Sequence, residues 1–153
     1  MDRTQKRESR GLCLQILFAN NFSENNFEEL LDNFFVSTEI DLERNSFTPK
    51  QIEYASQLYA AVLKGKDNVD KIIEEKLVNW EMSRLAIMDM MILRMSISEM
   101  LFIDDIPPKV SITEAVEIAK EYSSKDSSSF VNGIMDAVYN ENYKSLKKKK
   151  YEN

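Results

Sequence analysis

Apolar residues recur along this 153-residue chain at intervals of three and four positions, and no segment alternates apolar and polar residues as a half-buried strand would. This spacing predicts helices over about residues 4–22, 26–37, 48–64, 67–79, 83–103, 111–122 and 126–138. The 83–103 segment is apolar nearly all round, so we expect it to be central and buried. Seven helices without strands predict an all-α bundle fold.

Local signals mark several of the predicted helix ends. The stretch from Thr48 to Gln51 offers an N-cap threonine, a proline at the first helical position and a glutamine that can complete a capping box. Gly65 is typical of the position just past a helix end, and we expect the third helix to end there. The stretch from Ser111 to Glu114 predicts a second capping box, and Asp126 is expected to cap the last helix. We expect Gly133, inside that helix, to permit close packing of a neighbour.

The composition fits one soluble domain. A chain with 43% apolar residues can bury a sizeable core without disulfides or metal. One cysteine and no histidine exclude a disulfide framework and the common zinc spacings. The sequence has no signal-peptide core and no apolar run of about 18 residues. We therefore expect a cytoplasmic protein with no membrane segment, no metal and no cofactor.

No residue constellation is typical of catalysis. The chain has no glycine-rich phosphate loop, no nucleophile that could pair with a histidine, and no acidic cluster with metal-ligand spacing. Cys13 lies among apolar residues and is expected to be a small buried side chain. The methionine-rich segment from Met82 to Met100 could form an adaptable partner groove, but core packing is the favoured explanation. We do not expect an enzyme.

Charge is distributed unevenly along the chain. The net charge of −6 by itself argues against nucleic-acid binding. The first ten residues, however, carry four cations and two anions, and the last ten carry five lysines and one glutamate, so the remaining body is strongly acidic. This asymmetry predicts that the two ends meet a polyanion that the body would repel. For the run Lys147–Lys150, the simpler explanation is a solvated terminal tail.

The cations near the start form one stripe if that segment is helical. The spacing i, i+3, i+4 and i+7 is shared by Arg3, Lys6, Arg7 and Arg10. Unpaired cations cannot enter a core, so we expect this basic end to project beyond the bundle or to stay unfolded until it binds. Short arginine-rich segments can fold on RNA. An ordinary charged helix start is the alternative, and the residues alone leave both open.

Three segments carry a family resemblance that spans most of the chain. The first is Lys6-Arg7-Glu8-Ser9-Arg10 followed by Leu14-Gln15-Ile16-Leu17-Phe18. The second runs from Arg84 to Asp89 and continues with Ile92 to Met95 and Glu99-Met100. The third, the most specific, runs from Ile106 to Ala115 and continues with Asp126-Ser127 and Phe130-Val131-Asn132-Gly133. In order and spacing these segments resemble the NusB transcription-antitermination family.

The resemblance implies a fold and a function. It implies a single domain over residues 1–153, with two three-helix-type bundles over 1–79 and 80–143 and a basic, disordered tail over 144–153. It also implies that the protein recognises boxA-type single-stranded RNA jointly with NusE, a ribosomal protein. That complex would join NusA, NusG and RNA polymerase and suppress termination in ribosomal RNA operons.

The resemblance also implies site residues, by position. The residues implied for RNA binding are Lys6, Arg7, Arg10, Phe18, Asp126 and Phe130. Among them, the three cations would meet RNA phosphates, and the two residues at the start of the last helix would flank the RNA surface. Asp89 corresponds to an acidic position at the NusE interface.

Two positions depart from the family pattern. Glu8 stands where arginine is frequent, which removes one cation and adds an anion. Phe18 stands where tyrosine is common, which removes a hydroxyl. Both departures bear on the strength of RNA binding and leave the fold untouched. A protein–protein adaptor of the same fold with weak or no RNA binding therefore stays open. The oligomeric state stays open too, because some family members form homodimers that would cover the RNA surface.

Overall fold

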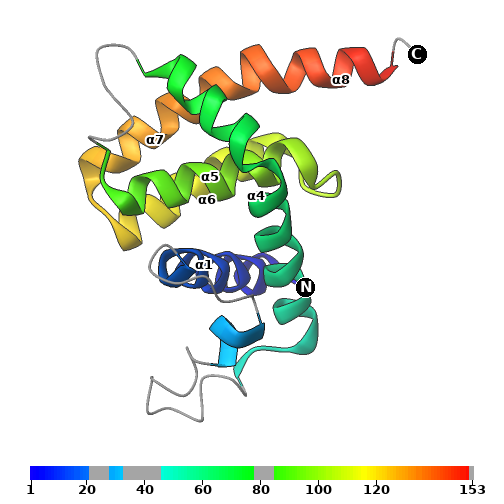
Figure 1. The fold of residues 1–153 in the computed structure, drawn as a ribbon, viewed down its shortest axis with the longest axis vertical. Coiled ribbons are helices and arrows are strands. Elements are labelled where there is room, and N and C mark those ends of the chain that lie inside the picture. Colours follow the sequence, from blue (N-terminus) through cyan, green and yellow to red (C-terminus); the bar gives the residue numbers. More distant parts are fainter. Residues whose placement is uncertain (21–27, 33–45, 78–84, 152–153) are drawn as a thin grey trace. The chain divides into compact units, whose positions relative to one another are not determined.

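The computed structural model describes residues 1–20, 28–32, 46–77 and 85–151. In these ranges every regular element is helical, and residues 28–32 form a short helical stretch. The named elements are α1 (Arg3–Asn20), α4 (Pro49–Lys76), α5 (Ile87–Phe102), α6 (Pro108–Tyr122), α7 (Lys125–Val138), the π-helical η2 (Tyr139–Tyr143) and α8 (Lys144–Tyr151), as Figure 1 shows. The predicted all-α fold is confirmed.

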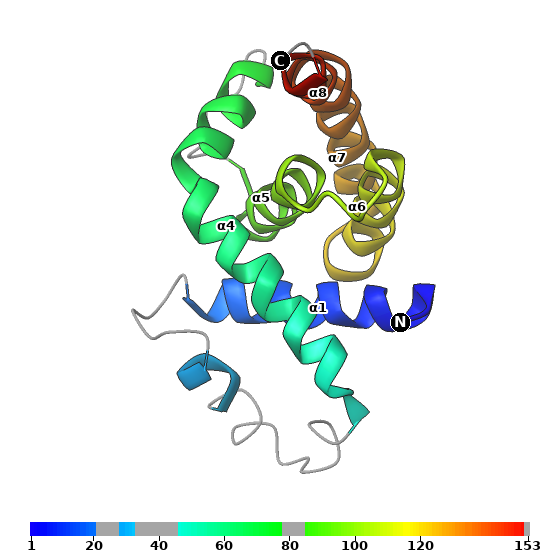
Figure 2. The same cartoon turned by 90° about the vertical axis from the view of Figure 1, so that its right-hand side faces the viewer.

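The chain divides into two compact units, Met1–Ala60 and Ala61–Asn153. In the first unit, α1 crosses the first turns of α4 (Figure 2), and Leu14 and Leu58 are fully buried. In the second unit, α5, α6 and α7 pack against one another. Among the described helices, none combines the length and apolar character that crossing a membrane requires.

The start of α4 is built as the sequence predicts. The backbone N–H of Gln51 donates to the Thr48 hydroxyl at 3.2 Å, and the Gln51 side-chain oxygen accepts from the Thr48 N–H at 2.8 Å. This reciprocal pair satisfies donors that a helix start leaves open, and Pro49 at the first helical position has no N–H to satisfy. The predicted capping box at Thr48 is confirmed.

The roles predicted for two glycines are wrong. Gly65 does not end a helix, because α4 continues through it to Lys76, so the predicted third and fourth helices are one. A Cβ at Gly65 would lie only 2.4 Å from Cε2 of Phe102 on α5, so here the missing side chain serves close packing. Gly133 is exposed, and a Cβ there would meet no described atom within 4 Å. It therefore does not admit a close neighbour.

The expected central helix is α5. Of the predicted 83–103 segment, residues 83 and 84 lie outside the described residues, and the helix runs from Ile87 to Phe102. Nearly all of it is buried, including Glu99, which is 2% exposed and accepts a hydrogen bond from the Ser111 hydroxyl of α6 at 2.7 Å. Arg94 makes two hydrogen bonds, of 2.7 and 3.1 Å, to the Asp70 carboxylate of α4. The predicted burial is confirmed. Glu99 and Arg94 are paired, whereas the buried Ser98 hydroxyl finds no hydrogen-bond partner among the described residues.

The starts predicted for the last two long helices are wrong. α6 begins at Pro108 with Pro107 as its N-cap, so Ser111 lies inside the helix and its hydroxyl serves Glu99. α7 begins at Lys125, and its N-cap is Ser124, whose hydroxyl accepts from the N–H of Ser127 at 3.1 Å. Proline can open a helix without a capping side chain, and Ser124 precedes Asp126 with an equally good capping group.

The C-terminal segment differs from the disordered tail that the sequence suggested. α7, η2 and α8 follow one another as a single helical rod (Figure 1). The Lys147 ammonium lies 2.8 Å from an oxygen of Asp104, which links α8 to the α5–α6 connection. The lysine-rich end is therefore helical in the structure as far as Tyr151.

Candidate nucleic-acid interface

The basic stripe lies on the first turns of α1, but its four members differ in exposure. Arg3 is exposed, Lys6 and Arg7 are half-buried, and Arg10 is only 3% exposed. The expectation that this end projects beyond the fold or stays unfolded is therefore wrong for Arg10. The helix is formed and Arg10 belongs to the interior.

Tyr54 of α4 contacts two of these cations. The Lys6 ammonium lies 5.4 Å from the centre of the Tyr54 ring, and the Arg10 guanidinium carbon lies 6.0 Å from it. The tyrosine is 7% exposed, and cation–π attraction strengthens where water is excluded. Long cationic side chains can also pack their aliphatic stems against apolar surface. Tyr54 thus holds two cations of the stripe in defined positions.

Gln51 connects the start of α4 to the same face of α1. Its side-chain Nε2 donates to the backbone oxygen of Gln5 at 3.0 Å and to Oε2 of Glu8 at 3.1 Å. Gln51 is 1% exposed, and its two hydrogen bonds link the start of α4 to α1. Glu8 itself is exposed, and its carboxylate is oriented by Gln51. The acidic departure in the basic segment therefore has a partner in this chain.

The aromatic and acidic residues implied for RNA binding occupy both units. Phe18 lies near the C-terminal end of α1 and is 36% exposed. In the second unit, Asp126 is exposed on the first turn of α7, and Phe130 is half-buried one turn later. The neighbouring Val131 is fully buried, so Phe130 stands at the edge of that helix's apolar face.

Asp89 lies at the start of α5 and faces the corner between α6 and α7. One carboxylate oxygen accepts from the Ser123 hydroxyl at 2.8 Å, and the other accepts from the Ser127 hydroxyl at 2.9 Å. The residue is 8% exposed. Two hydroxyl donors of the chain itself therefore satisfy this carboxylate. Because Ser127 follows Asp126 directly, Asp89 also orders the start of α7.

Sequence reasoning missed Tyr54 and the second role of Gln51. Tyr54 lies four positions before Leu58 and so shares its inner face, but no sequence pattern pairs it with cations more than forty positions away. Gln51 was identified only as a capping residue. Within the described ranges, no group of three or more ligating side chains could hold a metal ion.

Comparisons with known proteins agree with the segments noted in the sequence. Residues 7–140 match the NusB family. The transcription antitermination protein NusB of Clostridium novyi (strain NT) is 37% identical over 130 residues, which are 85% of this chain and 94% of that protein. The solved T. maritima NusB is similar with a TM-score of 0.76 at 31% identity, covering 89% of this chain and 91% of that one.

A solved complex described as antitermination factors NusB and NusE with dsRNA contains a chain of the same fold. The TM-score is 0.76, the identity is 23%, and the match covers 91% of this chain and 98% of that chain. At this identity the likeness is one of fold. Since the family match spans most of the chain and the relatives above exceed 30% identity, this protein belongs to the NusB family.

Proposed function

We propose that this protein is a cytoplasmic RNA-binding adaptor for transcription antitermination, without enzymatic activity. It would bind boxA-type single-stranded RNA jointly with NusE, and the complex would join NusA, NusG and RNA polymerase to suppress termination in ribosomal RNA operons. The observation that carries the proposal is the basic face of α1, ordered by Tyr54, in a member of the NusB family.

The RNA surface would use residues of different kinds. Lys6 and Arg7 are half-buried, so their charged ends can reach phosphates while their stems stay packed. Arg10 is almost fully buried and would act mainly by contributing positive potential and by holding the Tyr54 ring. Phe18, Asp126 and Phe130 would flank the RNA, with the two rings available for stacking on bases.

The NusE interface would include Asp89. Two hydroxyls already bind its carboxylate, so a basic NusE side chain would approach the small edge that remains exposed. We also propose the domain plan that the family implies. It comprises two three-helix-type bundles over residues 1–79 and 80–143, with α4 in place of the predicted third and fourth helices, followed by the basic segment 144–153.

The proposal is tested by titrating a boxA-type RNA and an unrelated RNA of equal length, with and without NusE, over a range of salt. Lys6→Gln combined with Arg7→Gln removes two charges and leaves the buried Arg10 in place. If each contacts one phosphate, the slope of log affinity against log salt should flatten by about 1.4, since each phosphate on a single strand contributes about 0.7. Binding of both RNAs should weaken, because phosphate contacts carry no sequence information.

The matched control is Lys64→Gln with Lys66→Gln, two exposed lysines of α4 that change the net charge equally. It should leave the affinity and the salt slope near those of the unchanged protein. Adding NusE should tighten binding of the boxA-type RNA more than that of the unrelated RNA.

The second candidate is a protein–protein adaptor of the same fold with weak or no RNA binding. Glu8 favours it, because its exposed carboxylate lies within the basic segment and repels phosphates. If NusE binds the unchanged protein while neither RNA binds with or without NusE, the adaptor function replaces the RNA-binding one.

A further inference from the structure

The end of the C-terminal rod, formed by η2 and α8, carries a dense positive charge that the proposed RNA surface does not use. Residues 139–151 contain five lysines and a single acidic residue, Glu141. The family match ends at residue 140, so nearly all of this segment lies beyond what the family describes.

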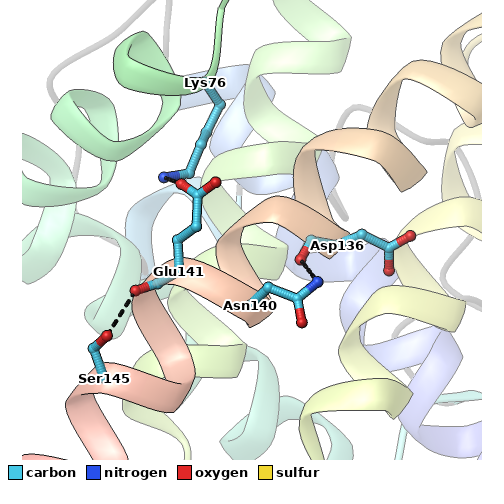
Figure 3. Close-up of polar contacts among 5 residues, drawn as sticks. All are labelled: Lys76, Asp136, Asn140, Glu141 and Ser145. Carbon is cyan, nitrogen blue, oxygen red and sulfur yellow. Dashed lines mark hydrogen bonds and ion pairs between the residues drawn. The ribbon is translucent and has the colours of Figure 1, made fainter.

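Glu141 does little to offset that charge. Its carboxylate pairs with the ammonium of Lys76 on α4, whose side chain is 7% exposed (Figure 3). Figure 3 also shows the Asn140 amide bound to the backbone oxygen of Asp136, at 3.0 Å, and the Ser145 hydroxyl bound to that of Glu141, at 2.9 Å. These contacts hold the π-helical turn, where helices often carry functional residues. The only anion of the segment is thus neutralised from within the fold.

Two tyrosines of this segment each lie beside a lysine. The rings of Tyr139 and Tyr143 lie 5.6 Å apart in a stacked arrangement. The Lys144 ammonium lies 4.9 Å from the centre of the Tyr139 ring, and the Lys147 ammonium lies 5.5 Å from the centre of the Tyr143 ring. Both rings are half-buried, and each attracts the lysine beside it by a cation–π contact.

The two lysines differ in their remaining partners. The Lys144 ammonium also donates to the neutral side-chain oxygen of Asn140, at 3.1 Å. Lys147 shares its charge with Asp104, which anchors α8. Of the two ammonium groups, that of Lys144 binds a neutral acceptor and that of Lys147 binds an exposed carboxylate.

We propose that η2 and the start of α8 form a second contact surface for single-stranded RNA, with Lys144 and Lys147 as phosphate ligands beside the stacked rings of Tyr139 and Tyr143. Proteins that bind single strands without sequence preference combine cations that follow the backbone with aromatic rings on which bases stack. This inference rests on the RNA-binding function proposed above and extends it to a segment outside the family match.

An anionic membrane is the other polyanion that lysines attract, and the composition of α8 disfavours it. A helix that lies in a membrane interface needs a broad apolar face. The sequence of α8 offers one aliphatic residue, Leu146, and one aromatic residue, Tyr151. RNA therefore fits the surface better, because it requires charge and rings without an apolar stripe.

The test uses the full chain and a labelled single-stranded RNA long enough to reach beyond the boxA element, titrated over a range of salt. Lys144→Gln with Lys147→Gln should flatten the salt slope by about 1.4 and weaken binding roughly 25-fold at 0.1 M salt. Lys144→Gln alone leaves the Asp104 anchor intact and should flatten the slope by about 0.7. Lys64→Gln with Lys66→Gln is the control of equal charge. Circular dichroism and melting establish that each variant is folded.

The outcomes separate this inference from the proposed function. If the Lys6 and Arg7 variant loses RNA affinity while both Lys144 variants behave like the control, the second surface is overturned and the proposed function stands. If the Lys144 variants lose affinity and the α1 variant does not, the second surface stands and the α1 site falls. Absence of RNA binding by the unchanged protein overturns both. Binding to phosphatidylserine vesicles that depends on Lys144, with RNA affinity unaffected, overturns the inference in favour of a membrane.

Discussion

At the scale of single residues, Asp89 shows how a nearly buried charge can organise a corner of the fold. Its two carboxylate oxygens bind hydroxyls on either side of the break between α6 and α7. Ser124 extends the network, since its hydroxyl lies 3.0 Å from that of Ser127 and also caps α7. The position of the last long helix, and of Asp126 and Phe130 on it, therefore depends on a carboxylate of α5.

Replacement of Asp89 by alanine should accordingly destabilise the protein by about 2–3 kcal/mol, because hydrogen bonds to a charged group contribute about 1.5–3 kcal/mol and removal leaves hydroxyls unsatisfied. Urea unfolding measures the loss. Asp67→Ala, which removes an exposed carboxylate on α4, is the control and should stay within about 0.5 kcal/mol. Equal stability of the two variants would show that the serine hydroxyls do not depend on Asp89.

The phenol of Tyr59 makes the stability of the folded protein depend on pH. Burial in the first place, and the nearby Cys13 thiol in addition, raise the pKa of the Tyr59 phenol above its ordinary value of 10.0. The folded state therefore holds this proton more tightly than the unfolded chain does. The stabilisation is complete below pH 10 and is lost as the pH rises toward the folded-state pKa.

We expect the free energy of unfolding to fall above pH 10, and Tyr59→Phe to make that fall shallower. Chemical denaturation at several alkaline pH values, compared with neutral pH, measures both slopes. Tyr139→Phe, which changes a half-buried tyrosine of the other unit, provides the comparison. Identical alkaline slopes for the unchanged protein and Tyr59→Phe would show that ionisation of Tyr59 does not cause the loss of stability.

At the scale of elements, α4 shows what the sequence could and could not predict. Its start at Thr48 follows from four adjacent residues, so local chemistry was sufficient. The reason for a glycine inside the helix, at position 65, is the close approach of Phe102, which is 37 positions away and belongs to another helix. From sequence alone, a glycine in a helical pattern predicts the end of the helix. Only the structure shows that the Phe102 ring lies against this glycine. Tyr54 was missed for the same reason, since its cations come from α1.

The two helical glycines give a matched pair for testing this account. Gly133→Ala meets no described atom and should stabilise the protein by about 0.5–1 kcal/mol through helix propensity. Gly65→Ala gains the same propensity but must displace the Phe102 ring, which is 43% exposed and can shift, so we expect a net change near zero.

When Phe102 is replaced by leucine, the ring that opposes a side chain at position 65 is removed. Gly65→Ala should then stabilise the Phe102→Leu protein by about 0.5–1 kcal/mol. A double-mutant cycle by urea unfolding measures this coupling. If Gly65→Ala stabilises the protein equally in both backgrounds, the contact with Phe102 does not limit the position.

At the scale of the whole molecule, the net negative charge and the local clusters of cations have opposite effects on RNA binding. The chain carries a net charge of −6, so its parts repel one another on average and would repel RNA. The cations that would attract RNA are concentrated on α1 and on the C-terminal rod. Net charge alone suggested no nucleic-acid partner, and only the distribution along the chain pointed to one.

Raising the salt concentration from 0.05 to 0.5 M should therefore weaken RNA binding steeply and leave the melting temperature unchanged or slightly higher. Salt screens the self-repulsion of the acidic body and also competes for phosphate contacts. Melting curves and RNA titrations in the same buffers measure the two responses. An RNA affinity that does not change with salt would show that cations contribute little to binding.

The hydrogen bonds of Gln51 also have an evolutionary consequence. One side chain completes the cap of α4 and orients Glu8 on α1, 43 positions earlier in the chain. A substitution at position 51 would leave the carboxylate of Glu8 without this donor, and an arginine at position 8 would face a donor amide. We expect positions 8 and 51 to have changed together during the divergence of the family. Relatives that retain arginine at position 8 should carry an acceptor, such as glutamate, where this chain has Gln51.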